Sequence, residues 1–390
     1  PICARYMGMF MAVFATSSVI GPLVGGLFAG AEQILWITGW RWVFLINLPI
    51  GIAALFMVVN FLHIPHTKVK NARIDWWGAV AIIVAVVPLL VVAEQGRTWG
   101  WDSTNSIAAY SIGGIGIVAF IAIERAMKED ALLPLSLFSS NSFSMSTVMG
   151  TIVGVGMFGG MMTIPLILQI VYGANPTEAG LLMLPMVLGM MTASILSGRI
   201  TGKTGKYKRF LIAGTGFMTV SYFYLSQLTY QWEIWQISIG MIVLGAGLGQ
   251  LMQTLNMVAQ NSVDAKHIGV ATSSATFFRQ MGGTAGVAIF ISILFSTLKD
   301  KAPEMGKAIA AAIQKNPALM AKPENQVFKP GSNLGDMIST DSSFLKHVSP
   351  ELGNPIKQAF AESAVTVFGT AAIVVAIAFV LTWFVKEVAL

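Results

Sequence analysis

Long apolar blocks dominate the chain, and short segments rich in Gly, Pro, Asn or charged residues separate them. The blocks are continuously apolar, without the period of two that is typical of membrane-spanning strands. A bilayer core about 30 Å thick needs about 20 mostly apolar residues in a helix. The pattern therefore predicts an all-α polytopic membrane protein with ten transmembrane helices, at residues 7–30, 42–62, 77–94, 106–124, 143–171, 179–198, 209–229, 233–258, 267–296 and 361–384.

Composition supports this fold class and excludes several others. Of the 390 residues, 55% are hydrophobic and only 11% are charged, whereas about 25% are charged in a typical soluble domain. So few charges exclude a soluble enzyme, a disordered chain and a nucleic-acid-binding protein, although the net charge is +6. The single cysteine, Cys3, excludes a disulfide framework. No catalytic Ser/His/Asp arrangement or metal-binding cluster is visible, so we expect neither an enzyme nor a bound cofactor.

The distribution of Lys and Arg predicts the orientation in the membrane. With a cytoplasmic N-terminus, thirteen Lys and Arg residues fall on the cytoplasmic side, whereas the short loops outside hold only Arg41 and Arg97. Cytoplasmic loops carry such an excess, so both termini of the chain are predicted to be cytoplasmic. Residues 299–358 then form a polar extracellular loop, partly ordered, with a helix at 305–315. Residues 131–143 are predicted to lie at the cytoplasmic interface.

Five motifs occur in a characteristic order. The first two are Gly21-Pro22-Leu23-Val24-Gly25-Gly26 and the segment from Gly39-Trp40-Arg41-Trp42 through Asn47-Leu48-Pro49 to Gly51. They are followed by Leu133-Pro134-Leu135-Ser136-Leu137-Phe138, the basic segment from Gly198 to Arg209, and Phe278-Arg279-Gln280-Met281-Gly282-Gly283. In this order they resemble the fourteen-span drug:proton antiporters of the major facilitator superfamily, and the likeness covers nearly the whole chain.

The resemblance implies a domain organisation. The ten blocks correspond to family spans five to fourteen, which makes this an N-terminally truncated copy. Residues 1–63 would be the last two spans of the N-terminal bundle, 64–141 two inserted spans with an interfacial linker, and 142–390 a complete six-span C-terminal bundle with the extracellular loop 299–358. The acidic residue that the family uses for protons lies in its first span, outside this sequence.

The resemblance also implies a function. We expect export of small amphipathic or cationic compounds across a bacterial plasma membrane, in exchange for protons and driven by the proton gradient without an organic cofactor. The partners would be the lipid bilayer, the substrates and protons, and accessory export proteins remain open. Two alternatives are an exporter of a specific lipid, siderophore or metabolite, and a transport-dead truncated remnant.

Two N-terminal motifs supply the first candidate sites. Small residues four apart let a second helix backbone approach closely, and in the family this motif meets the C-terminal bundle and opposes proton leak. The alternative is generic helix packing. The residues of this antiporter motif are Gly21, Pro22, Gly25 and Gly26. The motif that opens the second predicted span contributes Trp40, Arg41, Trp42, Asn47 and Pro49.

A basic segment between two spans is a candidate cytoplasmic gating loop. Its candidate residues are Gly198, Arg199, Gly205, Lys206 and Arg209. Gly permits a tight turn, and cations can pair with acidic groups or helix C-termini. The Asp of the family pattern is replaced here by Gly202, which weakens the expected charge latch. An ordinary positively charged cytoplasmic loop is the alternative.

Polar residues inside two blocks are candidates for a cavity or for coupling. Amides cover one helical face of about 120°, and at membrane depth they must face protein or water. They are Gln250, Gln253, Asn256 and Gln260. Arg279 is the only formal charge well inside a block and is predicted to face the bundle interior, in bundle coupling or as a structural pair. The acidic residues, including Glu124 and Glu362, fall at block ends, where a solvated carboxylate is expected.

Overall fold

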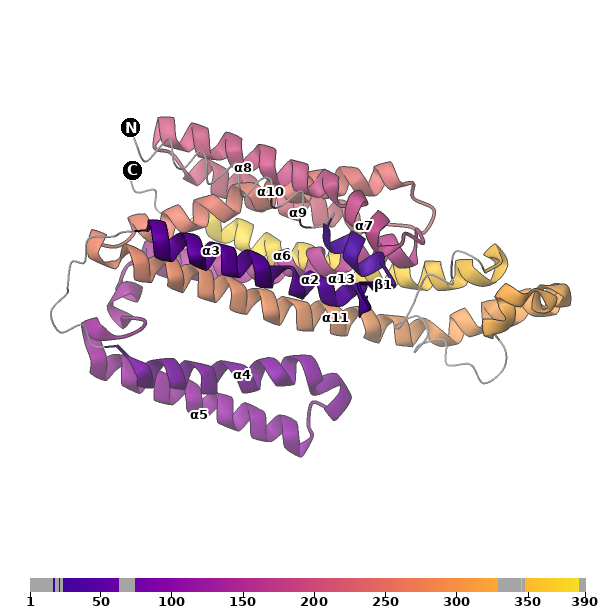
Figure 1. The fold of residues 1–390 in the computed structure, drawn as a ribbon, viewed down its shortest axis with the longest axis horizontal. Coiled ribbons are helices and arrows are strands. Elements are labelled where there is room, and N and C mark those ends of the chain that lie inside the picture. The colour runs from indigo at the N-terminus through magenta and orange to yellow at the C-terminus, as the bar shows by residue number, and fades with distance from the viewer. Residues whose placement is uncertain are drawn as a thin grey trace.

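The computed structural model describes residues 17, 21, 24–62, 74–328, 345 and 348–385. Helices dominate this part of the chain (Figure 1). The strands in it are β1 (Gln33–Ile34) and β2 (Ile37–Thr38), which pair antiparallel as a minimal hairpin. Most of the first predicted span, 7–30, lies outside the described residues, although residues 24–30 are helical.

The N-terminal part continues from the hairpin into two short helices. They are α2 (Gly39–Leu45) and α3 (Asn47–Phe61), which together cover the predicted span 42–62. None of the side chains of α3 is buried against other described residues. A helix that is apolar all round needs an apolar solvent, and α3 therefore suits the bilayer.

Two long helices form a hairpin beside the main bundle. They are α4 (Trp76–Trp99) and α5 (Thr104–Met127), and the pair lies to one side of the molecule (Figure 1). Asp75 caps α4 by accepting the Gly78 N–H at 2.7 Å, and Ser103 caps α5. The linker then forms the 3-10 helices η1 (Lys128–Asp130) and η2 (Leu135–Ser139), so no span lies within residues 131–140, and the next long helix begins at Asn141.

Seven of the described helices build the main bundle. The helices that follow the linker are α6 (Asn141–Ile170), α7 (Pro176–Leu182), α8 (Leu184–Thr204), α9 (Lys208–Leu225), α10 (Ile234–Asn261), α11 (Ile268–Lys315) and α13 (Pro350–Thr382). Short 3-10 helices flank α11, namely η3 (Ala265–His267), η4 (Pro317–Ala321) and η5 (Pro323–Phe328). α10 packs along both α8 and α9, while α6 packs along α11 and α13.

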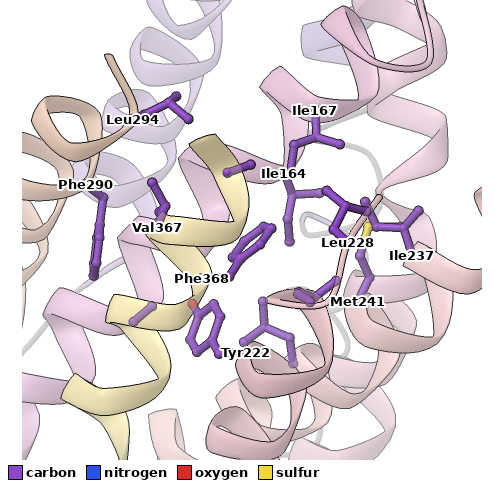
Figure 2. Packing of buried hydrophobic residues seen from close by; sticks show 14 of the residues in the cluster. Ile164, Ile167, Tyr222, Leu228, Ile237, Met241, Phe290, Leu294, Val367 and Phe368 are labelled. Carbon is purple, nitrogen blue, oxygen red and sulfur yellow. The ribbon is translucent and has the colours of Figure 1, made fainter. Parts of the chain in front are cut away.

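The bundle core is built from side chains of α6 to α11 and α13, part of which Figure 2 shows. At its centre the ring of Tyr222 on α9 stacks on Phe368 of α13, with ring centroids 6.1 Å apart. The Tyr222 hydroxyl donates to the Gly156 carbonyl of α6, so its one polar group is satisfied. Ile164, Met241 and Phe290 complete the surrounding wall, and each is less than 2% exposed.

Several helices extend beyond the predicted spans. α8 continues to Thr204 instead of ending at 198, α11 continues to Lys315 instead of 296, and α13 begins at Pro350 instead of 361. The predicted extracellular loop 299–358 is therefore helical at both of its ends. Hydropathy marks only the part of a helix that lies in lipid. The 48 residues of α11 span about 72 Å, which is much longer than the hydrocarbon core, so hydropathy detects only part of this helix.

Among the described residues, eight helical segments are long and apolar enough to cross a membrane. They include α2–α3 and α7–α8 as single crossings. The 18-residue α9, which opens with Lys208 and Arg209, is not among the eight but lies within the bundle. With α9, the described residues account for nine of the ten predicted spans.

Candidate functional site

The amide residues of α10 lie on a face distinct from its core-packing face. Leu251, Leu255 and Val258 are buried in the core, at most 2% exposed. Gln253, Asn256 and Gln260 project from the other side and are half-buried. Periodicity therefore placed these three amides correctly on one side of the helix, while Gln250, at the edge of the arc, is 8% exposed.

Two side-chain hydrogen bonds join this face of α10 to α11. Arg279 donates from Nη1 to Oδ1 of Asn256 at 3.2 Å. Nearer the C-terminal end of α10, Gln260 donates from Nε2 to Oγ1 of Thr272 at 3.0 Å. We call these four residues the α10–α11 polar seam. Arg279 is 9% exposed and lies eleven residues into α11, about 17 Å along its axis.

The charge of Arg279 has a neutral partner. Among the described residues no carboxylate forms an ion pair with it, and the Asn256 amide is the side chain that it contacts by hydrogen bonding. A cation near mid-membrane is costly unless water, protein dipoles or an anion solvate it. The guanidinium therefore has donors to spare for water or for a transient anionic group.

Glycines bring α11 against α6 and fix the position of Arg279. A Cβ at Gly154 of α6 would overlap the Arg279 carbonyl oxygen, and one at Gly282 would overlap the Thr151 carbonyl. Only glycine allows this approach of two backbones. The motif that follows Arg279, Gly282-Gly283, thus packs the helix that carries the charge.

The other two amides face α8 and α9. The buried Oε1 of Gln253 has no hydrogen-bond partner among the described residues, and it lies 2.7 Å from where a Cβ of Gly198 would stand. Gln250 lines an open groove with residues of α8 and α9. The four amides therefore divide between α11 on one side and α8 and α9 on the other, and they do not converge on one point.

The antiporter motif touches the C-terminal bundle through part of its length. A Cβ at Gly26 would lie 2.8 Å from the Pro176 carbonyl oxygen, and one at Gly30 would lie 2.5 Å from Oγ1 of Thr177. The Thr177 hydroxyl donates to the Gly26 carbonyl at 2.7 Å. At Gly21 and Gly25 no described atom lies within 4 Å of a Cβ position. Pro22 lies outside the described residues.

The motif that opens the second span forms a turn at the start of α2 and α3. The Trp42 indole N–H donates to the Ile34 carbonyl at 2.8 Å, and its ring stacks on Phe28 at 6.4 Å. Arg41 lies 5.4 Å from the centroid of the Trp40 ring. The Asn47 amide donates to the Val43 carbonyl at 3.0 Å, and Pro49 follows in the first turn of α3. These contacts order the turn.

The predicted gating loop is shorter than expected. Gly198 and Arg199 lie within α8, because this helix ends only at Thr204. The loop proper is Gly205–Tyr207, and Gly205 adopts φ +69°, the left-handed conformation that favours glycine. Lys206 and Arg209 are exposed, while Lys208 between them donates to the Trp383 carbonyl of α13 at 3.1 Å.

One carboxylate was wrongly expected to be solvated at a block end. Glu124 is 1% exposed and accepts the Leu133 N–H through Oε2 at 2.9 Å. Asp75, 6% exposed, accepts the adjacent Leu132 N–H through Oδ2 at 3.3 Å. The linker thus folds back over the end of the hairpin where α4 begins and α5 ends. The sequence does carry a signal for this packing, namely the apolar run Ala131-Leu132-Leu133 beside charged residues. An apolar segment at such a boundary is expected to pack against neighbouring helices.

An ion pair links α11 and α13. Lys301 and Glu362 form it, and the Gln358 amide also donates to Glu362, at 3.0 Å. Glu362 is therefore engaged with its neighbours and does not project alone into a vestibule. Within the described part of the chain, no group of three or more His, Cys, Asp or Glu could hold a metal ion.

Comparison with known proteins identifies the family. The family model described as Major Facilitator Superfamily matches residues 4–287. A tetracycline resistance determinant of Streptomyces rimosus is 32% identical over 318 residues, which cover 80% of this chain and 91% of that protein. The multidrug transporter protein MdtP of Bacillus subtilis is 29% identical over 403 residues, covering 99% of this chain and 71% of the relative.

A third relative shows that the chain matches only part of some family members. An uncharacterized MFS-type transporter of Mycobacterium tuberculosis is 33% identical over 390 residues, and the chain spans about half (52%) of its length. The family match, these relatives and the apolar helices of the bundle agree, and the chain belongs to the Major Facilitator Superfamily of membrane transporters.

Proposed function

We propose that this transporter exports small amphipathic, often cationic compounds from the cytoplasm in exchange for protons. Its relatives include a tetracycline resistance determinant and a multidrug transporter. The bundle offers what such substrates need, namely apolar helix walls interrupted by a few amides. Proton coupling rests on the family resemblance.

The observation that carries the proposal is the α10–α11 polar seam. Two amides, a threonine hydroxyl and a nearly buried guanidinium lie where two helices of the C-terminal bundle meet. Such groups are expensive in lipid and mark pathways for solutes or ions. Because Asn256 is neutral, the Arg279–Asn256 hydrogen bond can break and re-form without separating opposite charges.

In this proposal the seam acts during alternating access. The two halves of a transporter of this kind rock about a central site. The Gln253, Asn256 and Gln260 amides would contact polar atoms of a substrate. As the two halves rock, Arg279 would exchange its hydrogen bond to Asn256 for water or for a transient anionic group.

Accumulation of a fluorescent cation tests the proposal. Bacteria that lack their own efflux pumps and produce this protein should hold less ethidium than cells with an empty vector, and a protonophore should abolish the difference. Tetracycline accumulation, measured in parallel, tests the wider substrate range. Equal ethidium and tetracycline levels in both strains, with the protein present in the membrane, would contradict the proposed function.

A further inference from the structure

A groove opens between α8 and α9 at the end of the bundle that the charge pattern places in the cytoplasm. Both helices pack along α10 but pack only weakly on each other, so α10 forms the floor between them. The groove has a volume of about 700 Å³. Gln250 of α10 lies at its floor, and its side-chain amide has no hydrogen-bond partner among the described residues.

The walls of the groove are apolar along the depth of one leaflet. Phe210, Ala213 and Phe217 recur on one face of α9, and Ile200 of α8 faces them across the groove. Ile200 is 45% exposed and Phe217 43% exposed. From Arg209 to Phe217 the groove follows eight residues, about 12 Å, which is close to half of a hydrocarbon core about 30 Å thick.

The mouth of the groove is cationic. Lys206 and Arg209 both line it, and no carboxylate is among the described residues that do so. Lys208, which lies between them in sequence, is bonded to α13, so the two lining cations share one side of the loop. Basic residues at this level attract the anionic lipids of the cytoplasmic leaflet.

We propose that this groove binds one anionic phospholipid of the cytoplasmic leaflet, with its phosphate between Lys206 and Arg209 and an acyl chain along Phe210, Ala213 and Phe217. A cationic export substrate is excluded as the occupant, because Lys206 and Arg209 at the mouth of the groove would repel it. The lipid would hold α8 and α9 apart at a fixed spacing on α10. The proposal requires only that the protein is embedded in a bilayer, and it is independent of the exported substrate.

Native mass spectrometry of the purified protein with added phosphatidylglycerol tests this site. Lys206→Gln/Arg209→Gln is expected to bind it roughly ten-fold or more weakly than the unchanged protein, because each cation near a lipid phosphate contributes to affinity. Arg199→Gln/Lys203→Gln is the matched control: it removes the same charge from neighbouring positions that do not line the groove, and its affinity should stay near that of the unchanged protein.

A second variant separates a lipid from a free anion. Ala213→Trp fills the apolar part of the groove without changing charge, and it should weaken phosphatidylglycerol binding while the protein stays monodisperse. Phosphatidylcholine, with the same acyl chains and no net charge, should bind weakly to every variant. Equal loss in both charge variants, unchanged binding in Ala213→Trp, or equal affinity for the two lipids would overturn the proposal. Each readout is obtained without transport, so failure of the export hypothesis leaves it intact.

Discussion

At the scale of single residues, Arg279 is the feature that most distinguishes this bundle from a generic membrane scaffold. It is 9% exposed and hydrogen-bonded to a neutral amide. A purely structural role would need a partner that offsets the free-energy cost of burying the charge, and an amide offsets less of that cost than a carboxylate does. The guanidinium is therefore better explained by a function that uses its charge.

Arg279→Gln is expected to reduce ethidium efflux roughly ten-fold, the size of effect that follows from losing a hydrogen bond of a charged group. Its thermal unfolding midpoint should stay equal to that of the unchanged protein or rise, since a buried charge has been removed. Efflux assays and unfolding in detergent measure the two effects. Gln280→Ala, at the exposed neighbouring position, should leave both unchanged. A lower midpoint with efflux intact would show that Arg279 is only structural.

Polar partners at this scale could be predicted only in part. The helical period of 3.6 residues places Gln253, Asn256 and Gln260 on one side of α10, and the structure agrees. Which residues they contact depends on how α8 and α11 are rotated about their axes and shifted along them. The sequence of α10 alone carries no information about either. Thr272 and Gly198 were therefore not expected as neighbours of these amides.

At the scale of elements, the end of α8 depends on one glycine conformation. Gly205 terminates the helix at φ +69°, where a side chain costs about 1 kcal/mol or more. Gly202, three residues earlier, is helical and has no described atom within 4 Å of a Cβ position. The two glycines of the same basic segment thus have different physical roles.

Gly205→Ala should lower the free energy of unfolding by about 1–2 kcal/mol. Gly202→Ala should leave it unchanged or raise it by up to about 1 kcal/mol, because alanine favours a helix over glycine. Thermal unfolding of the purified variants in detergent distinguishes them. If the two substitutions had the same effect, the turn would not depend on the left-handed conformation of Gly205.

The linker after α5 is held by buried carboxylates. Glu124→Ala leaves the Leu133 N–H without the acceptor that it now has at 2.9 Å, and an unpaired buried donor costs about 1–3 kcal/mol. The linker at residues 131–140 should then open more often and be cleaved faster in limited proteolysis. Glu94→Ala, an exposed carboxylate on α4, is the control. Equal cleavage rates in both variants would argue against the hydrogen bond between Glu124 and the Leu133 N–H as the contact that holds the linker.

Element boundaries were the least predictable part of the fold. The apolar runs located α4, α5, α6 and α10 to within a few residues, because lipid imposes a minimum length of apolar helix. The same runs ended α11 at 296, although the helix continues to Lys315. Beyond the membrane a helix is stabilised by helix propensity and by packing; for example, the buried Ile309 packs in the bundle core. Hydropathy reports neither of these effects.

At the scale of the whole molecule, exposed apolar surface is consistent with a bilayer solvent. α3 has no buried side chain, and Phe56 and Phe61 are 66% and 76% exposed. The bundle, in contrast, has a continuous core that joins α6, α9, α10, α11 and α13. The division into residues 1–63, 64–141 and 142–390 stays a prediction, as does the fourteen-span organisation of the whole protein.

Proton-coupled export is the central claim, and reconstitution tests it most directly. The protein, placed in liposomes with a pH gradient and ethidium on one side, should move ethidium against its concentration gradient toward the acidic side. A pH-sensitive dye should report protons leaving that side at the same time. Ethidium movement that does not depend on the imposed pH gradient, with no accompanying proton flux, would contradict proton-coupled export.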